Sequence, residues 1–164
     1  MERLKKFLSN IKKSHEFKEW HKENKDSYLS DCFALLNDRY DINKIDWQVD
    51  YYNPHNDEMT SFSEKDNKVS IKKDQKILKD KRDIVKELDV SKVKTNADDV
   101  IKKIKEKYPD QIPNKIIVIL QNIDITVWNI TFVTRSFNVL NVKIDAENGD
   151  VIDESLKPVF EIKK

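Results

Sequence analysis

A stripe of apolar residues recurs at helical spacing along residues 2–24, from Leu4 to Trp20. Such a stripe is typical of an amphipathic helix that packs on a core. Ser14 and His15 interrupt it, so the segment forms either one helix or two. Its polar positions carry charges of both signs, which does not suit an anionic membrane surface. The stripe therefore predicts helical structure that covers a core.

The next fifty residues predict four strands. Residues 28–37 are so rich in apolar side chains that they fit a strand or a helix, and the repeat described below favours a strand. Alternation is clearer around Trp47, Val49 and Tyr51, which share one face of an extended segment. Asn, Asp and Pro mark the turns between the runs. The predicted strands are 28–37, 46–53, 58–63 and 69–78, with turns at 53–57 and 65–68.

A charged connector, residues 79–95, leads to a second helix and a second set of strands, and part of the connector is itself a candidate helix. Asn96 is placed as an N-cap before two acidic residues, and Pro109 ends the helix. The continuous apolar run 114–122 predicts a strand buried on both faces. Asn148-Gly149 is the strongest hairpin signal, because both residues tolerate positive φ. The later strands are expected at 128–132 and 139–144 and from Val151, with the last residues as a tail.

The two halves of the chain follow the same plan. In each, a helix leads to an apolar run, a tryptophan, an aromatic residue, a turn, a strand, a second turn and a valine. Trp47 precedes Val69 by 22 positions, and Trp128 precedes Val151 by 23. Both tryptophans are expected in the core. The pattern predicts an α+β fold of two tandem helix-plus-antiparallel-sheet units, residues 1–78 and 96–164, which pack together or join edge to edge into one compact domain.

The charge of the chain bears on its partners. Lys and Arg number 31 against 30 Asp and Glu, so the net charge at pH 7 is +1. Proteins that bind nucleic acids or anionic membranes usually carry a net basic field, which is missing here. Neither nucleic acid nor a membrane is therefore an expected partner.

Cysteine content and hydropathy bear on the compartment. Cys32 is the single cysteine, so no internal disulfide can form, as is usual in a reducing compartment. No apolar run reaches the roughly 18 residues of a membrane span. Residues 1–20 lack the apolar segment of a signal peptide. We therefore expect a cytoplasmic protein.

Residues 97–152 resemble a PepSY domain. The resemblance rests on the helix "ADDVIKKIKEKYP", the strand with "VWNITFV" and the closing "VLNVKIDAENGDVID". PepSY sequences typically close with a strand, an Asp, a small residue, a Gly-containing turn and a valine. The positions that match this ending are Val142, Asp145, Ala146, Gly149 and Val151. The resemblance implies a small α+β module of the kind found in protease propeptides and cell-envelope proteins, where an inhibitory or chaperone-like role is suspected.

Few residues suggest chemistry. His15 and His21 are six positions apart and lie on different faces of a helix. His55 lies in the "NPHND" turn near Asp57 and Glu58, which is a candidate metal loop, although a solvated turn is commoner. The "DAENGD" segment (145–150) lacks the glutamate that a calcium loop needs and predicts a turn. Cys32, in an apolar run, is expected as a small buried hydrophobe. No cofactor is expected.

Aromatic residues gather around the first hairpin. If one sheet face is uncovered, they form a binding surface; if the helices cover them, they form core. The candidate surface residues are Tyr51, Tyr52, His55 and Met59.

The leading hypothesis is a non-enzymatic module that recognises a protein or peptide at a sheet face or strand edge. One alternative is a small metal-dependent hydrolase that uses His55, Asp57 and Glu58. The other is a sheet-based nucleic-acid binder, whose affinity would fall steeply with salt. Its basic residues would be Lys72, Lys73, Lys76 and Lys79.

Overall fold

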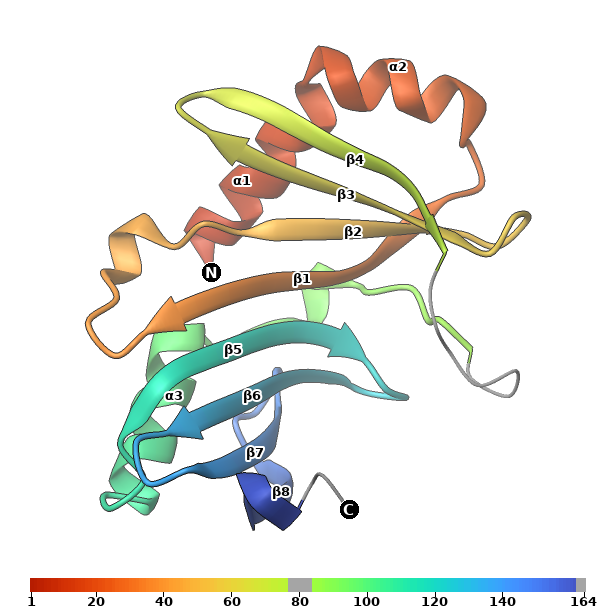
Figure 1. The fold of residues 1–164 in the computed structure, drawn as a ribbon. Coiled ribbons are helices and arrows are strands. Elements are labelled where there is room, and N and C mark those ends of the chain that lie inside the picture. The colour runs from red at the N-terminus through yellow and green to blue at the C-terminus, as the bar shows by residue number, and fades with distance from the viewer. Residues whose placement is uncertain (77–83, 162–164) are drawn as a thin grey trace.

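A computed structural model describes residues 1–76 and 84–161 of the chain (Figure 1). In this part, eight antiparallel strands form one sheet in the order β4-β3-β2-β1-β5-β6-β7-β8. The helices are α1 (Glu2–Lys13), α2 (His15–Glu23) and α3 (Ala97–Lys107). The strands are β1 (Tyr28–Asn37), β2 (Gln48–Asn53), β3 (Glu58–Lys65), β4 (Lys68–Lys76), β5 (Pro113–Asn122), β6 (Thr126–Thr134), β7 (Asn138–Asp145) and β8 (Val151–Pro158).

The sheet consists of two four-stranded meanders that share an edge. β1 pairs with β5 over seven residues, from Asp31 opposite Gln121 to Asn37 opposite Lys115. This pairing satisfies backbone groups that would otherwise be exposed at two strand edges. The α+β class is confirmed. The two halves are not separate tandem units, because β1 and β5 join their strands edge to edge in one continuous sheet, which is the second of the two arrangements expected.

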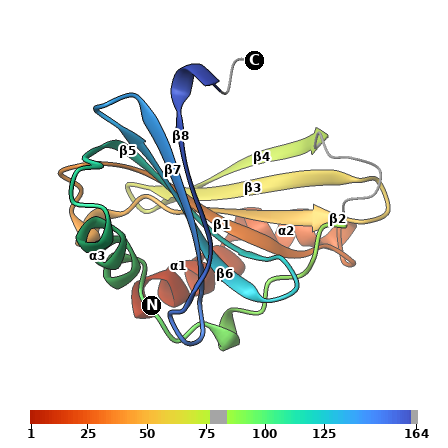
Figure 2. The same cartoon turned by 90° about the horizontal axis from the view of Figure 1, so that it is seen from below.

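All three helices cover the same face of the sheet, as Figures 1 and 2 show. The apolar stripe of each helix packs on alternate residues of the strands, so one core cluster extends through both halves. Trp47 and Trp128 lie in this core with their ring centroids 6.3 Å apart, as expected. Cys32 is also fully buried there. A second aromatic group in the core consists of Phe17, Trp20, Tyr51 and Phe62.

The first helical segment is two helices with a break at Ser14. This residue has φ −66° and ψ 151°, outside the helical region, and its Oγ accepts a hydrogen bond from the Phe17 amide at 3.2 Å. Ser14 is therefore the N-cap of α2, a position that serine favours. Asn96 holds the N-cap position of α3 as expected, but its Oδ1 accepts from the N-terminal amine at 2.6 Å instead of capping the helix.

The strands of the second half follow the expected order, with two differences. β5 is buried on one face only, because Ile116, Val118 and Leu120 enter the core while the alternate residues are more exposed. β8 continues to Pro158, so the expected tail begins in a strand. The turn before β8 uses Gly149 at φ 81°, a conformation that favours glycine, and Asp145 Oδ1 accepts from the Glu147 amide at 2.7 Å.

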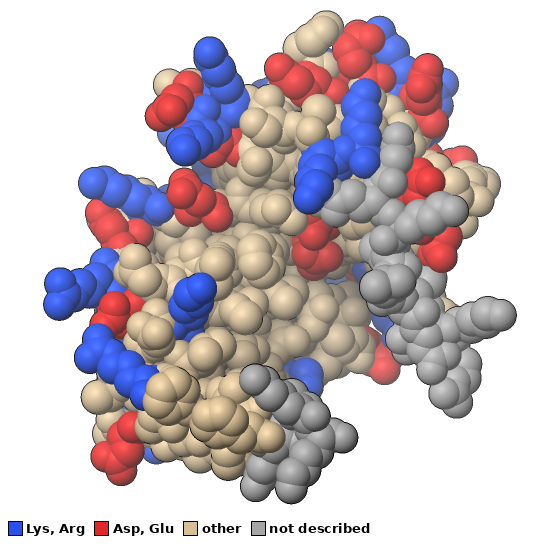
Figure 3. Space-filling model, viewed as in Figure 1, with Lys and Arg blue, Asp and Glu red and all other residues tan. Residues whose placement is uncertain are grey.

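The opposite face of the sheet, called the open face below, carries no helix among the described residues. It presents the residues that alternate with the core positions, such as Phe33 of β1, Asp50 of β2 and Asn141 of β7. In Figure 3, charged side chains are concentrated toward the margins of this face, and few lie at its centre.

The charged connector is only partly described, because residues 77–83 lie outside the described ranges. From residue 84 onward it runs along the helix-bearing side, with one 3-10 turn at Val90–Lys92 and no α-helix. Leu88 and Val93 are buried in the core. This half of the connector is therefore a packed part of the fold.

Candidate functional site

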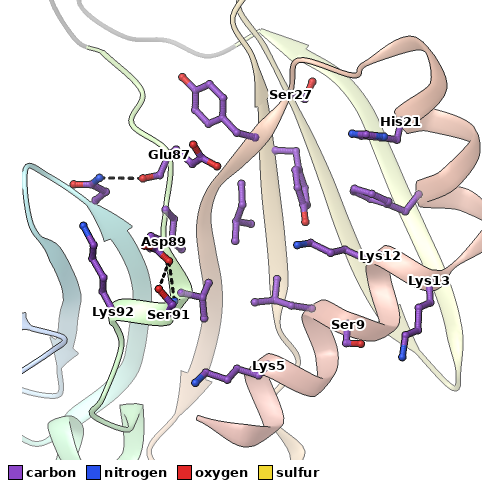
Figure 4. Close-up of a pocket in the computed structure, with 18 residues that line it drawn as sticks. Lys5, Ser9, Lys12, Lys13, His21, Ser27, Glu87, Asp89, Ser91 and Lys92 are labelled. Carbon is purple, nitrogen blue, oxygen red and sulfur yellow. Dashed lines mark hydrogen bonds between the residues drawn. The ribbon is translucent and has the colours of Figure 1, made fainter.

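A groove opens on the helix-bearing side between α1, α2 and the connector (Figure 4). We call it the α1 groove, and its cavity measures about 1170 Å³. It is lined by Lys5, Leu8, Ser9, Lys12, Lys13, Phe17, His21, Ser27, Tyr28, Leu29, Tyr51, Glu87, Leu88, Asp89, Val90, Ser91, Lys92 and Asn122. Segments that are far apart in sequence therefore build one site.

The floor of the α1 groove is apolar. Leu8 and Phe17 come from the apolar stripes of α1 and α2, and Tyr51 comes from the core face of β2. Leu29 of β1 and Leu88 of the connector complete it. Leu8, Phe17, Tyr51 and Leu88 are between 4% and 8% exposed, and Leu29 packs against the same core cluster, so the floor presents only a narrow margin of that core. Apolar surface of this kind favours contact with aliphatic or aromatic groups.

The wall formed by α1 is basic. This helix contains five Lys or Arg residues and one acidic residue, Glu2. In Figure 4, Lys12 extends from α1 into the groove, and Lys5 reaches toward the connector. Neither lysine, nor Lys13, forms an ion pair within the described part of the chain. Their ammonium groups are therefore available to an acceptor outside the chain.

The opposite wall is the connector, which three hydrogen bonds hold in place. The Leu88 amide donates to the Leu29 carbonyl at 2.8 Å, and the Tyr28 hydroxyl donates to the Val85 carbonyl at 2.6 Å. Asn122 Nδ2 donates to the Glu87 carbonyl at 3.0 Å. These bonds tie the connector to β1 and β5, so the sheet fixes the position of this wall.

Two hydroxyl groups that belong to the lining have no hydrogen-bond partner among the described residues. Tyr51 Oη and Ser27 Oγ are buried and make no hydrogen bond within the described part of the chain. Burial raises the pKa of the Tyr51 hydroxyl above its usual range, so this group remains a donor at neutral pH. A buried donor without an acceptor is unfavourable and rare in native proteins. An acceptor that enters the groove and reaches Tyr51 would remove this cost.

The structure separates the four residues expected to form a binding surface. Tyr51 points into the core, whereas Tyr52 and Met59 lie on the open face, and both tyrosines are almost fully buried. Tyr52 donates a hydrogen bond to Asp57, and Met59 Sδ accepts from Ser30 at 3.3 Å. The expected exposed aromatic surface is therefore not present at Tyr51 and Tyr52.

His55 is exposed at the turn between β2 and β3. Its Nε2 lies 2.7 Å from Asp26 Oδ2, and Asp57 is bound by Tyr52 instead. Among the described residues, no group of three or more His, Cys, Asp and Glu could hold a metal ion. The arrangement therefore lends no support to a hydrolase centred on His55, Asp57 and Glu58.

The lysines considered for nucleic-acid binding lie on or after the edge strand β4. Lys72 and Lys73 are exposed. The side chain of Lys76 and the whole of Lys79 lie outside the described parts, so the basic patch stays a prediction. No helix in the described ranges is long and apolar enough to cross a membrane.

Sequence reasoning missed a pair of carboxyl groups on the open face. Asp31 of β1 and Asp50 of β2 are opposite each other in the ladder. Burial, together with the neighbouring Asp50, raises the pKa of Asp31 to about 8, so Asp31 holds a proton at neutral pH. Ser30 Oγ lies 2.9 Å from Asp31 Oδ2, and Gln48 Nε2 donates to Asp50 Oδ1 at 3.0 Å. The pair is thus satisfied by its own surroundings, unlike the hydroxyls of the α1 groove.

Comparison with known proteins identifies the fold alone. No family model and no curated protein matches the sequence. The structure is similar to the crystal structure of a protein from Clostridium difficile 630 described as "a putative lipoprotein". The TM-score is 0.52 at 15% sequence identity, over 87% of this chain and 90% of the other. At this identity the likeness shows a shared fold.

Proposed function

We propose that the chain is a non-enzymatic binding module whose α1 groove receives an extended acidic segment of a partner protein. The observation that carries the proposal is the buried Tyr51 hydroxyl, which has no partner in the described structure. Tyr51 lines a cavity that also offers lysine ammonium groups, and an acceptor must displace the side chains around the buried hydroxyl to reach it.

The chemistry of the groove selects the partner. The lining contains four lysines and two acidic residues, Glu87 and Asp89, so its net charge is positive. The lysines and Tyr51 are donors, so they favour an acceptor such as a carboxylate or a peptide carbonyl. The apolar floor favours aliphatic or aromatic side chains beside that acceptor. The wall from Lys5 to Lys13 spans roughly 12 Å of helix, about the length of four extended residues. A short peptide with acidic and apolar residues fits these three features.

The family resemblance supports a related proposal, that the chain arose by duplication of a PepSY-like unit. In each half, helical structure precedes four antiparallel strands, and the halves meet at the first strand of each. β1 and β5 have the same length, 10 residues. A binding role fits the roles suspected for PepSY domains.

Peptide display tests the proposed function. A random peptide library is selected on the full-length protein, and bound peptides are measured by fluorescence polarisation. We expect enriched sequences to combine Asp or Glu with apolar residues. Lys12→Glu should weaken their binding at least tenfold, because it reverses a charge in the groove.

The matched control is Lys6→Glu, which makes the same charge change on an exposed position of α1 that does not line the groove. It should leave the affinity within about twofold, since exposed charges act weakly at a distance in salt. Equal losses in both variants, or a library without enrichment, would refute the proposed site.

A further inference from the structure

The last strand of the sheet, β8, pairs only with β7 among the described residues, which leave its outer edge free. It is the end member of the strand order, and seven of its eight residues are exposed. Leu156 is 44% exposed, as is Ile152. A strand edge with unpaired backbone groups can pair with another strand. The side chains and register of β8 determine which strand fits this edge.

The ladder shows which groups point outward. The Val159 amide donates to the Phe137 carbonyl at 2.7 Å, continuing the β7–β8 register in which Lys157 faces Val139 and Ser155 faces Asn141. Hydrogen-bonded pairs alternate along an antiparallel ladder. The backbone groups of Ser155 and Lys157 consequently point toward β7, and those of Glu154 and Leu156 point toward solvent.

We propose that β8 pairs antiparallel with β8 of a second copy of this chain, centred on Ser155, to form a symmetric dimer. In this register Glu154 of each copy faces Leu156 of the other, and their outward backbone groups exchange hydrogen bonds. Asp153 faces Lys157 of the second copy, and symmetry repeats the contact.

The charged side chains of β8 favour the register centred on Ser155 over the registers centred on Glu154 or Leu156. Asp153 and Lys157 lie on the open face, where Asp153 also contacts Lys143 of β7 at 3.3 Å. Residues of opposite charge that face each other stabilise antiparallel strands. Centring the pair on Glu154 would place two glutamates opposite each other. Centring it on Leu156 would place Glu154 opposite Pro158, which lacks an amide donor. The centre at Ser155 is the arrangement that gains both charge pairs and loses no donor from its central pairs.

The other edge strand, β4, has no such pair of opposite charges among its described side chains. The described side chains of β4 include Lys68, Lys72 and Lys73, all exposed. Like charges along an edge strand oppose pairing with an identical strand. Dimerisation is therefore assigned to β8, and it involves neither wall of the α1 groove.

Sedimentation velocity over a range of concentrations tests the dimer. The contact is small, so we expect a weak dimer with Kd between about 10 µM and 1 mM. Lys157→Glu should shift the protein to the monomer, because it places a glutamate opposite Asp153 of the second copy. The double variant Asp153→Lys/Lys157→Glu reverses both charges and should restore the dimer.

A backbone variant gives an independent check. Leu156→Pro removes an outward amide, so it should abolish the dimer while the β7–β8 ladder keeps its bonds; circular dichroism verifies that each variant is folded. Wild-type protein that stays monomeric up to 1 mM overturns the proposal. A dimer that survives both Lys157→Glu and Leu156→Pro also overturns it, as does a double variant that remains monomeric.

Discussion

The ring and the hydroxyl of Tyr51 contribute differently to the fold. It is buried and has no hydrogen-bond partner among the described residues, although its ring packs among Phe17, Trp20 and Phe62. The ring therefore stabilises the fold, whereas the hydroxyl carries a desolvation cost without a compensating bond.

Tyr51→Phe should separate these two contributions. The free energy of unfolding is expected to stay the same or rise by about 1 kcal/mol, because the variant removes an unsatisfied donor and keeps the ring. Affinity for peptides selected on the wild-type protein should fall. Urea unfolding and fluorescence polarisation measure the two quantities. A loss of stability in this variant would show that the hydroxyl serves the fold.

Asp31 predicts a pH dependence of stability. An unfolded aspartate has a pKa near 4, whereas that of Asp31 in the fold is about 8. The folded state therefore holds a proton that the unfolded state releases, and the free energy of unfolding contributed by this group falls as pH rises from about 4 to about 8.

Asp31→Asn should remove this dependence, because an amide is neutral at every pH. Compared with the wild type, the variant is expected to gain more than about 1 kcal/mol at pH 8 and little at pH 4. Urea unfolding at pH 4, 6 and 8 gives the difference. A difference that does not change with pH would contradict the raised pKa.

At the scale of elements, the break between α1 and α2 orients both helices so that each lines the α1 groove. Ser14 ends the first helix and caps the second, so that Lys12 and His21 both reach the groove.

Ser14→Ala should lower the free energy of unfolding by about 1 kcal/mol, because the Phe17 amide loses its acceptor. Thermal unfolding checks this, and Ser14→Asp, which preserves a capping oxygen, should remain close to the wild type. Equal losses in both variants would argue against a capping role.

Most elements were predictable because their signals are local. The stripe from Leu4 to Trp20, the alternation around Val49 and the Asn148-Gly149 turn each specify a conformation from neighbouring residues. Pairing of β1 with β5 was not predictable, since no local pattern says which edges meet. The alternation placed Tyr51 with Val49 correctly, but it cannot say which face the helices cover. The groove was missed because its walls join residues as distant as Lys5 and Asn122; the apolar Leu88 in a charged connector was the available signal.

At the scale of the whole molecule, one sheet and one core join both halves. The core cluster includes Leu8 of α1 and Ile104 of α3, and the β1–β5 ladder connects the meanders. We therefore expect a single cooperative transition in calorimetry, with equal calorimetric and van't Hoff enthalpies. Two separate transitions would indicate that residues 1–78 and 96–164 unfold as independent units.

The α1 groove is the proposed binding site for the partner segment. An NMR titration of the labelled full-length protein with an acidic peptide selected by display locates the bound peptide on the fold. Binding in the α1 groove should change the amide shifts of α1 and of residues 87–92 and leave those of the open face and β8 unchanged. Shift changes confined to the open face or to β8, with α1 unaffected, would contradict it.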